Sequence, residues 1–139
     1  MVMKILAIDY GEKWIGLALS DEGHKWAFPY KILENGKDLL KNLAEIIKNE
    51  DIYKIVIGLP LNKKMQNTAQ TEEVRKWAEE LIKKVAIPTP SGRGPDRSVG
   101  VDFENEIFTT RMVRGGKDDH SHAAALTLES YLARHSKML

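Results

Sequence analysis

Apolar positions along the chain come in blocks whose spacing predicts alternating strands and helices. The first block, residues 3–9, is almost entirely apolar and ends on Asp9. A strand of this kind is covered on both faces, as at the centre of a sheet flanked by helices. Residues 15–19 form a second apolar run after a short polar connection that contains Gly11. The two runs predict a hairpin with Asp9 at its lip, where the carboxylate either faces a cleft or satisfies turn amides.

The next blocks change from a period of two residues to helical spacing and back. Residues 25–33 carry an apolar side chain at every second position, which predicts a half-buried strand, and Pro29 places it near a sheet edge. Residues 36–49 repeat apolar side chains at the three-and-four spacing of an amphipathic helix. Because another apolar run follows at residues 52–59, this helix predicts a crossover between parallel strands.

The second half of the chain predicts two further helices and one strand. The first of these helices has its apolar positions between residues 74 and 85 and a cap at Thr68 or Thr71. The other segments are a surface loop rich in Pro and Gly, a short strand and a terminal helix, at residues 88–98, 99–103 and 123–132. We therefore expect an α/β fold in which a five-stranded mixed sheet, with the first strand at its centre, is flanked by helices.

Composition adds limits to this picture. The 139 residues have the length of a single domain, which we expect to span 1–139. The absence of Cys excludes disulfides and thiolate metal sites, and the apolar runs are too short to span a bilayer. No stretch has the pattern of a signal peptide, so we expect a cytoplasmic protein with no membrane partner. Lys and Arg number 21 against 20 Asp and Glu, so any nucleic-acid binding depends on local patches.

Candidate chemistry gathers at three places. The first predicted strand ends on Asp9, the last runs into Glu104 and Glu106, and Asp119 and His120 stand at the start of the final helix. In a sheet whose first strand is central, these places converge on one edge, which is where open α/β sheets bind their ligands. Clustered carboxylates without Cys favour hard cations such as Mg²⁺ or Mn²⁺.

Four strings of residues resemble the YqgF family. They are DYGEKWIGLALSD (9–21), IVIGLPLN (55–62), EIFTT (106–110) and AAALTLESYL (123–132), and the resemblance spans essentially the whole chain. The family consists of RNase H-like proteins described as pre-16S rRNA nucleases and, earlier, as Holliday junction resolvases. The resemblance implies an RNase H-like fold and a metal-dependent nuclease, a hydrolase of phosphodiester bonds that processes the 5′ end of pre-16S rRNA in ribosome biogenesis.

The resemblance also assigns metal ligands. The family's first-strand acid falls on Asp9, its strand-five Glu on Glu106 and its helix-start Asp on His120, with Asp119 one residue earlier. Asp9, Glu106, Asp119 and His120 would together hold two Mg²⁺ or Mn²⁺ ions, which activate a water and stabilise the leaving oxygen. A His at this place is acceptable chemistry as a ligand or as a proton carrier.

Glycines and basic residues complete the implied site. The family's glycines fall on Gly11 and Gly16, and Ile107 stands where the family usually has Arg, a cation that Arg111 could supply. Candidates for contacts with the backbone phosphates of a substrate strand are Lys13, Lys63, Lys64, Arg93, Arg97, Arg111 and Arg114. We expect RNA in preference to DNA as substrate, pre-ribosomal particles as partners, and a monomer or dimer.

Three alternatives stay open. A Holliday junction resolvase acting on DNA would use the same site. An Asp-x-Gly after a first strand also opens the nucleotide-binding lobes of sugar-kinase and chaperone-type ATPases, although a chain of this length supplies only one lobe. A non-catalytic nucleic-acid-binding module would keep the fold and lose a metal ligand at position 120, and retained Mn²⁺ affinity would argue against it.

Overall fold

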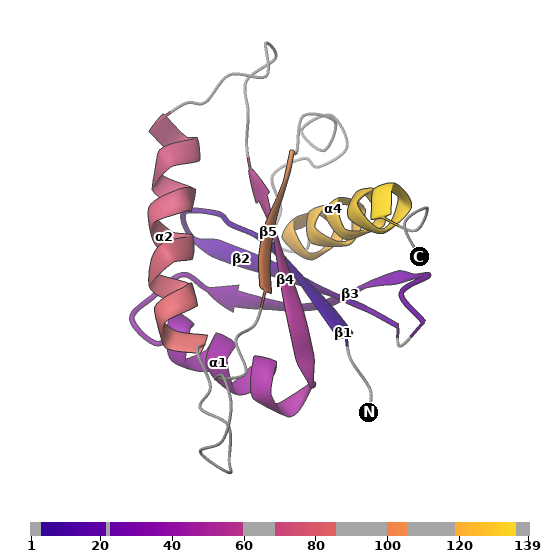
Figure 1. Ribbon diagram of the computed structural model, residues 1–139. Helices are drawn as coiled ribbons and strands as arrows, with labels where there is room; N and C mark the ends of the chain where they lie inside the picture. The colour runs from indigo at the N-terminus through magenta and orange to yellow at the C-terminus, as the bar shows by residue number, and fades with distance from the viewer. Residues whose placement is uncertain (1–3, 22, 60–68, 86–99, 106–118, 136–139) are drawn as a thin grey trace.

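Five strands form one mixed sheet in the order β3-β2-β1-β4-β5 (Figure 1). The computed structural model describes residues 4–21, 23–59, 69–85, 100–105 and 119–135. Strand β1 (Lys4–Asp9) is central, pairing antiparallel with β2 (Trp14–Ser20) and parallel with β4 (Ile52–Leu59). The apolar run before Asp9 and the crossover rule predicted this arrangement, and the structure confirms it.

The edges of the sheet are β3 (Ala27–Glu34) on one side and β5 (Gly100–Asn105) on the other. Strand β3 pairs antiparallel with β2, and β5 runs parallel to β4. Pro29 lies in the edge strand β3, where its missing N–H costs no bond inside the sheet, as its sequence position predicted. Since β1, β4 and β5 are all parallel, their carboxyl ends meet at the same edge of the sheet.

The helices cover the two faces of the sheet unequally. Helices α1 (Leu39–Asn49) and α2 (Ala69–Val85) pack on one face, and α4 (Asp119–His135) lies alone among the described helices on the other (Figure 1). The larger apolar cluster joins α1 and α2 to the sheet, and the smaller one lies beneath α4 around Ala124 and Leu128. No described helix is long and apolar enough to cross a membrane.

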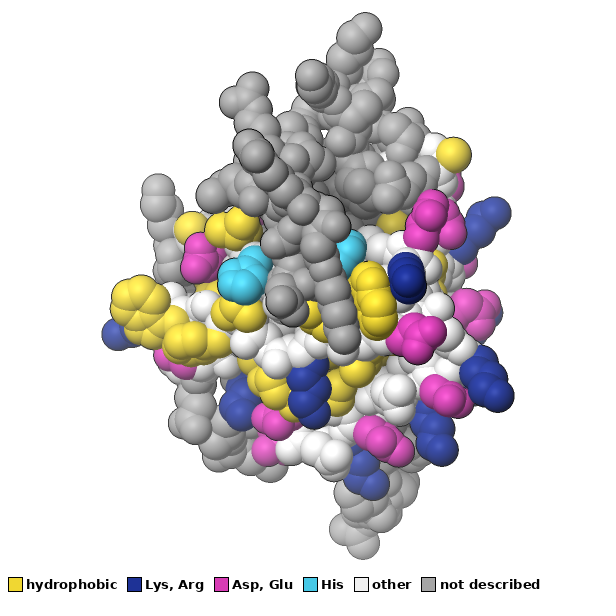
Figure 2. Space-filling view, turned by 180° about the vertical axis from the view of Figure 1, so that it is seen from behind, with side chains coloured by type: hydrophobic (Ala, Val, Ile, Leu, Met, Phe, Trp, Pro, Cys, Tyr) yellow, Lys and Arg dark blue, Asp and Glu magenta, His cyan; other side chains and the backbone are white. Residues whose placement is uncertain are grey.

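The expected burial of β3 is wrong at its start. Trp26, before the strand, is 66% exposed and Phe28 is 53% exposed, although the alternation of a half-buried strand placed both on its buried face. The register against β2 shifts between Leu17 and Ala18, so that Tyr30 is passed over in the pairing. This irregularity interrupts the alternation of β3. Hydrophobic side chains lie at the surface, as they do at the left edge of Figure 2.

Helix boundaries also differ from those that the sequence predicted. Helix α1 begins at Leu39 because residues 36–38 form a turn, and α4 is longer at both ends than the predicted 123–132. Thr71 lies fully buried inside α2, so it is no cap, while Thr68 lies outside the described residues. The predicted 88–98 loop also lies outside them.

Candidate functional site

Asp9 is the last residue of β1, and its side chain lies on the face of the sheet that α4 covers. Ile5 and Ala7 belong to the apolar cluster beneath α4, so Asp9 continues this alternate set. The residue is 8% exposed, and its pairing with Gly16 in β2 fixes its backbone. The carboxylate is therefore held by a paired central strand at the edge where three parallel strands end.

His120, in the first turn of α4, reaches Asp9 across 111 positions of sequence. Its ring Nδ1 lies 2.9 Å from Asp9 Oδ2. An ionised carboxylate only accepts hydrogen bonds, so Nδ1 donates whenever Asp9 is ionised and Nε2 remains as the second ring nitrogen. The Asp9 side chain is 12% exposed and that of His120 28%, so solvent meets the pair mainly through the imidazole. Two of the four predicted metal-site residues are thus in contact.

Gly11 and Gly16 make room for the start of α4. A Cβ on Gly16 would overlap the backbone carbonyl of His120 and come within 2.6 Å of the Ser121 nitrogen. A Cβ on Gly11 would lie 2.5 Å from the Trp14 carbonyl oxygen and 2.9 Å from His120 Cε1. The absence of two side chains on the hairpin is therefore what permits His120 to sit against Asp9.

The connection between β1 and β2 is tied to the end of β3. The Asn35 side-chain amide donates to the Gly11 carbonyl over 2.9 Å, and the Asn35 backbone N–H donates to the Lys13 carbonyl over 2.8 Å. Lys13 is exposed, with its ammonium 5.5 Å from the centre of the Trp14 ring. The predicted phosphate contact at Lys13 stays a prediction, although the residue is on the hairpin that presents Asp9.

Most of the other predicted site residues lie outside the described part of the chain. These are Glu106, Lys63, Lys64, Arg93, Arg97, Arg111 and Arg114. Asp119 is the first residue of α4, but the structure does not describe its side chain. Within the described residues no group of three or more His, Cys, Asp or Glu side chains could hold a metal ion. The pair Asp9 and His120 offers an oxygen and a nitrogen donor, which fit a divalent ion only in company with a further ligand.

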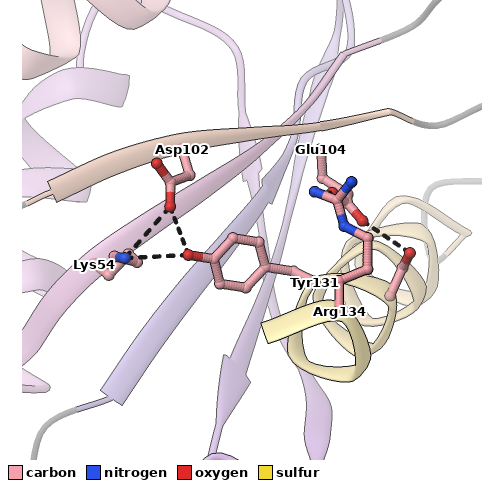
Figure 3. Close-up of polar contacts among 6 residues, drawn as sticks. Lys54, Asp102, Glu104, Tyr131 and Arg134 are labelled. Atoms are coloured by element: carbon pink, nitrogen blue, oxygen red, sulfur yellow. Dashed lines mark hydrogen bonds and ion pairs between the residues drawn. The ribbon is translucent and has the colours of Figure 1, made fainter. Parts of the chain in front are cut away.

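Glu104, which the sequence placed at the end of the last strand but not among the metal ligands, is the buried acid of β5. It is 3% exposed; Ser130 Oγ donates to its Oε2 over 2.8 Å, and Arg134 Nη2 forms an ion pair with its Oε1 (Figure 3). The signal was available in the alternation of β5, where Val101 and Phe103 pack toward the larger core and turn Glu104 toward α4. The carboxylate is held by α4 on both oxygens, which distinguishes it from a metal ligand open to solvent.

A second polar group joins α4 to β4 and β5. The Tyr131 hydroxyl donates to Asp102 Oδ2, Lys54 Nζ donates to the same hydroxyl over 3.1 Å, and Lys54 also lies 3.3 Å from Asp102 (Figure 3). Burial, assisted by the hydrogen bond to Asp102, raises the pKa of Tyr131, and the hydrogen bond with Tyr131 raises the pKa of Lys54. This group fixes the later half of α4 against the edge strand.

Comparison with known proteins gives matches along nearly the whole chain. The family model RuvX, described as Holliday junction resolvase, matches residues 3–134. A protein of Maridesulfovibrio salexigens named "Putative pre-16S rRNA nuclease" is 38% identical over 136 residues, covering 95% of this chain and 99% of the relative. A protein of Rickettsia felis with the same name is 34% identical over 138 residues, covering 96% and 88%.

Solved structures of low sequence identity share the fold. T. thermophilus RuvC in complex with Holliday junction substrate has a TM-score of 0.56 at 13% identity, covering 96% of both chains. Another Thermus thermophilus RuvC structure has a TM-score of 0.55 at 10% identity, covering 98% of this chain and 96% of the other. At these identities the likeness concerns the fold alone, and it confirms the expected RNase H-like fold. With the family match and the two relatives above, it follows that this chain belongs to the RuvX (YqgF) family of nucleases.

Proposed function

We propose that this chain is a divalent-metal-dependent nuclease that trims the 5′ end of pre-16S rRNA. The observation that carries the proposal is the contact between Asp9 and His120, which joins the end of the central strand to the start of α4. Membership of a nuclease family supports hydrolysis of phosphodiester bonds, and the names of two relatives support the RNA substrate. Pre-ribosomal particles as partners, a single domain spanning 1–139 and a monomer or dimer belong to the same proposal.

In this proposal Asp9 is the indispensable metal ligand. Glu106 and either Asp119 or His120 would complete the ligand set, and bound Mg²⁺ or Mn²⁺ would supply a nucleophilic water and stabilise the leaving oxygen. The chain's own part is to hold the Asp9 carboxylate rigid and to keep the His120 ring oriented through Nδ1. His120 Nε2 is then free of that contact and can bind an ion or carry a proton.

The experiment is cleavage of precursor RNA, single-stranded RNA and a four-way DNA junction with Mg²⁺ and with Mn²⁺. We expect cleavage of the precursor RNA, and loss of activity by orders of magnitude in Asp9→Asn. The Asn side chain can still accept the hydrogen bond from His120, so the free energy of unfolding should change by about 1 kcal/mol or less.

Calorimetric titration with Mn²⁺ makes the test independent of the substrate chosen. Wild-type binding that survives intact in Asp9→Asn would contradict the proposed site. Cleavage of the junction alone would assign the DNA resolvase function that the family description names. A folded wild-type protein that binds nucleic acid but neither Mn²⁺ nor Mg²⁺ would be the non-catalytic module.

A further inference from the structure

Arg134, near the end of α4, has an exposed side chain whose charge is paired with a buried carboxylate, that of Glu104. Its side chain is 59% exposed, whereas the Glu104 carboxylate that it pairs with is 3% exposed. The positive end of the pair therefore faces solvent and the negative end lies beneath it. No described residue gives Glu104 Oε1 a well-directed hydrogen bond, so the pair with Arg134 is held by charge.

Glu104 in β5 lies at the same level along the strands as Asp9 in β1, the proposed catalytic carboxylate. Ile8 pairs with Ile57 and Ile57 with Phe103, so one residue further along these parallel strands Asp9 and Glu104 share a level. Neighbouring strands are about 4.8 Å apart, which separates the two Cα atoms by about 10 Å. Both side chains lie on the α4 face, since each contacts a residue of that helix.

The separation suits two phosphates a few nucleotides apart on one nucleic-acid strand. At a rise of about 3.4 Å per nucleotide along a duplex, about 10 Å corresponds to about three nucleotides. A strand cut at Asp9 and lying across the carboxyl ends of β1, β4 and β5 would bring a flanking phosphate to Arg134. Arginine is suited to this contact because its planar fork of N–H donors matches phosphate oxygens. The pair with Glu104 has already restricted the side chain, which reduces the entropy lost on binding.

We propose that Arg134, held by Glu104 and Ser130, is a substrate-binding residue that contacts a backbone phosphate flanking the cleaved bond. This inference rests on the proposed nuclease function and extends it to a residue outside the family strings. It also gives the chain a cation near the site although Ile107 stands where the family usually has Arg.

The test measures binding of a fluorescein-labelled single-stranded RNA in the presence of a chelator, so that no cleavage occurs. Replacing Arg134 alone would strand a buried carboxylate, and the loss of stability could mask the effect on binding. The informative comparison is therefore between two variants. Glu104→Gln keeps the Arg134 cation beside a neutral side chain, and the double variant Glu104→Gln with Arg134→Gln removes the cation as well. The matched control is Lys48→Gln, which removes an exposed charge from α1 on the opposite face.

We expect the double variant to bind RNA about 10-fold more weakly than Glu104→Gln at low salt. The slope of log K against log salt should fall by about 0.7, the loss of one phosphate contact with a single strand. Lys48→Gln should leave both quantities as in the wild type. If the pair of Arg134 and Glu104 only stabilises the fold, the double variant would have a lower melting temperature and an unchanged slope. An equal slope in Glu104→Gln and the double variant would therefore overturn the inference. If the wild type binds no RNA and cleaves nothing, the proposed function fails and this inference fails with it.

Discussion

Two glycines determine how closely α4 approaches the hairpin that carries Asp9. The carbonyl of His120 occupies the space that a side chain on Gly16 would need, and Gly11 faces the His120 ring itself. The neighbours of Gly16 belong to another element far away in sequence, whereas those of Gly11 are Trp14 in the same hairpin and His120 in α4. The hairpin thus supplies both the Asp9 carboxylate and the space in which His120 approaches it.

Gly16→Ala should separate Asp9 from His120. The added methyl group meets backbone atoms, which cannot rotate away, so α4 must shift at a cost of about 1–3 kcal/mol in the free energy of unfolding. Cleavage and Mn²⁺ affinity should fall together in the fraction that remains folded. Gly36→Ala is the matched control, because a Cβ there has nothing within 4 Å. Unchanged Mn²⁺ affinity in Gly16→Ala would show that the start of α4 is not part of the site.

The sequence predicted Asp9 and left the choice between Asp119 and His120 open for a physical reason. A strand fixes the direction of alternate side chains, so an acid at the end of an apolar run has one orientation. At the start of a helix one residue turns the direction by about 100° in a helix of 3.6 residues per turn. The structure brings His120 to Asp9, and the side chain of Asp119 lies outside the described residues.

At the scale of elements, the sequence did not predict the polar contacts of α4 with β4 and β5. Strand and helix order follow from periodicity, and so does the central place of β1. The contact of Tyr131 with Lys54 and Asp102 joins residues 77 and 29 positions away in sequence, and no local pattern marks it. The irregularity in β3 was hidden for the same reason, because it belongs to the pairing with β2 and not to β3 alone.

Tyr131→Phe should weaken the attachment of α4 and make stability less sensitive to alkaline pH. The pKa of Tyr131 is raised above its ordinary 10.0 and that of Lys54 above 10.5, so the folded state holds both protons more tightly than the unfolded chain. Their contribution is complete below about pH 10 and is lost as the pH rises through the folded pKa values. The variant should lose about 1 kcal/mol at neutral pH for the missing hydrogen bonds.

Urea unfolding at neutral pH and in steps above pH 10 measures this difference. The wild type should lose more stability over that interval than Tyr131→Phe. If the unfolding free energies of the two proteins fall in parallel as the pH rises, the contact with Asp102 and Lys54 does not raise the pKa of Tyr131.

For the whole molecule, two carboxylates distant from Asp9 should contribute to the loss of stability in acid. Hydrogen bonds from the backbone of Trp26 foremost, and of Lys25, lower the pKa of Asp21 in the turn after β2. The hydrogen bond from Lys4 lowers the pKa of Glu50, which follows α1. A lowered pKa means that the contribution is present above the ordinary values of 3.8 and 4.5 and is lost as the pH falls below them.

Asp21→Asn and Glu50→Gln should each flatten the decline of unfolding free energy with falling pH. Asp21 follows the last residue of β2, away from Gly16 near the start of that strand. Asp21→Asn should therefore also leave RNA cleavage nearly unchanged. Urea unfolding between neutral pH and pH 3, together with the cleavage assay, measures both effects. A large loss of cleavage in Asp21→Asn would mean that the turn after β2 takes part in the reaction.

The 111 positions between Asp9 and His120 also set an order of events during synthesis. The β1–β2 hairpin can form soon after its residues emerge, but α4 is the last element along the described chain and brings one half of the contact. A nascent chain without α4 leaves Ile5, Ala7 and Val56 uncovered on one face of the sheet. The contact between Asp9 and His120 therefore cannot form on a chain that still lacks α4, so the proposed metal site would stay incomplete until synthesis has passed this helix.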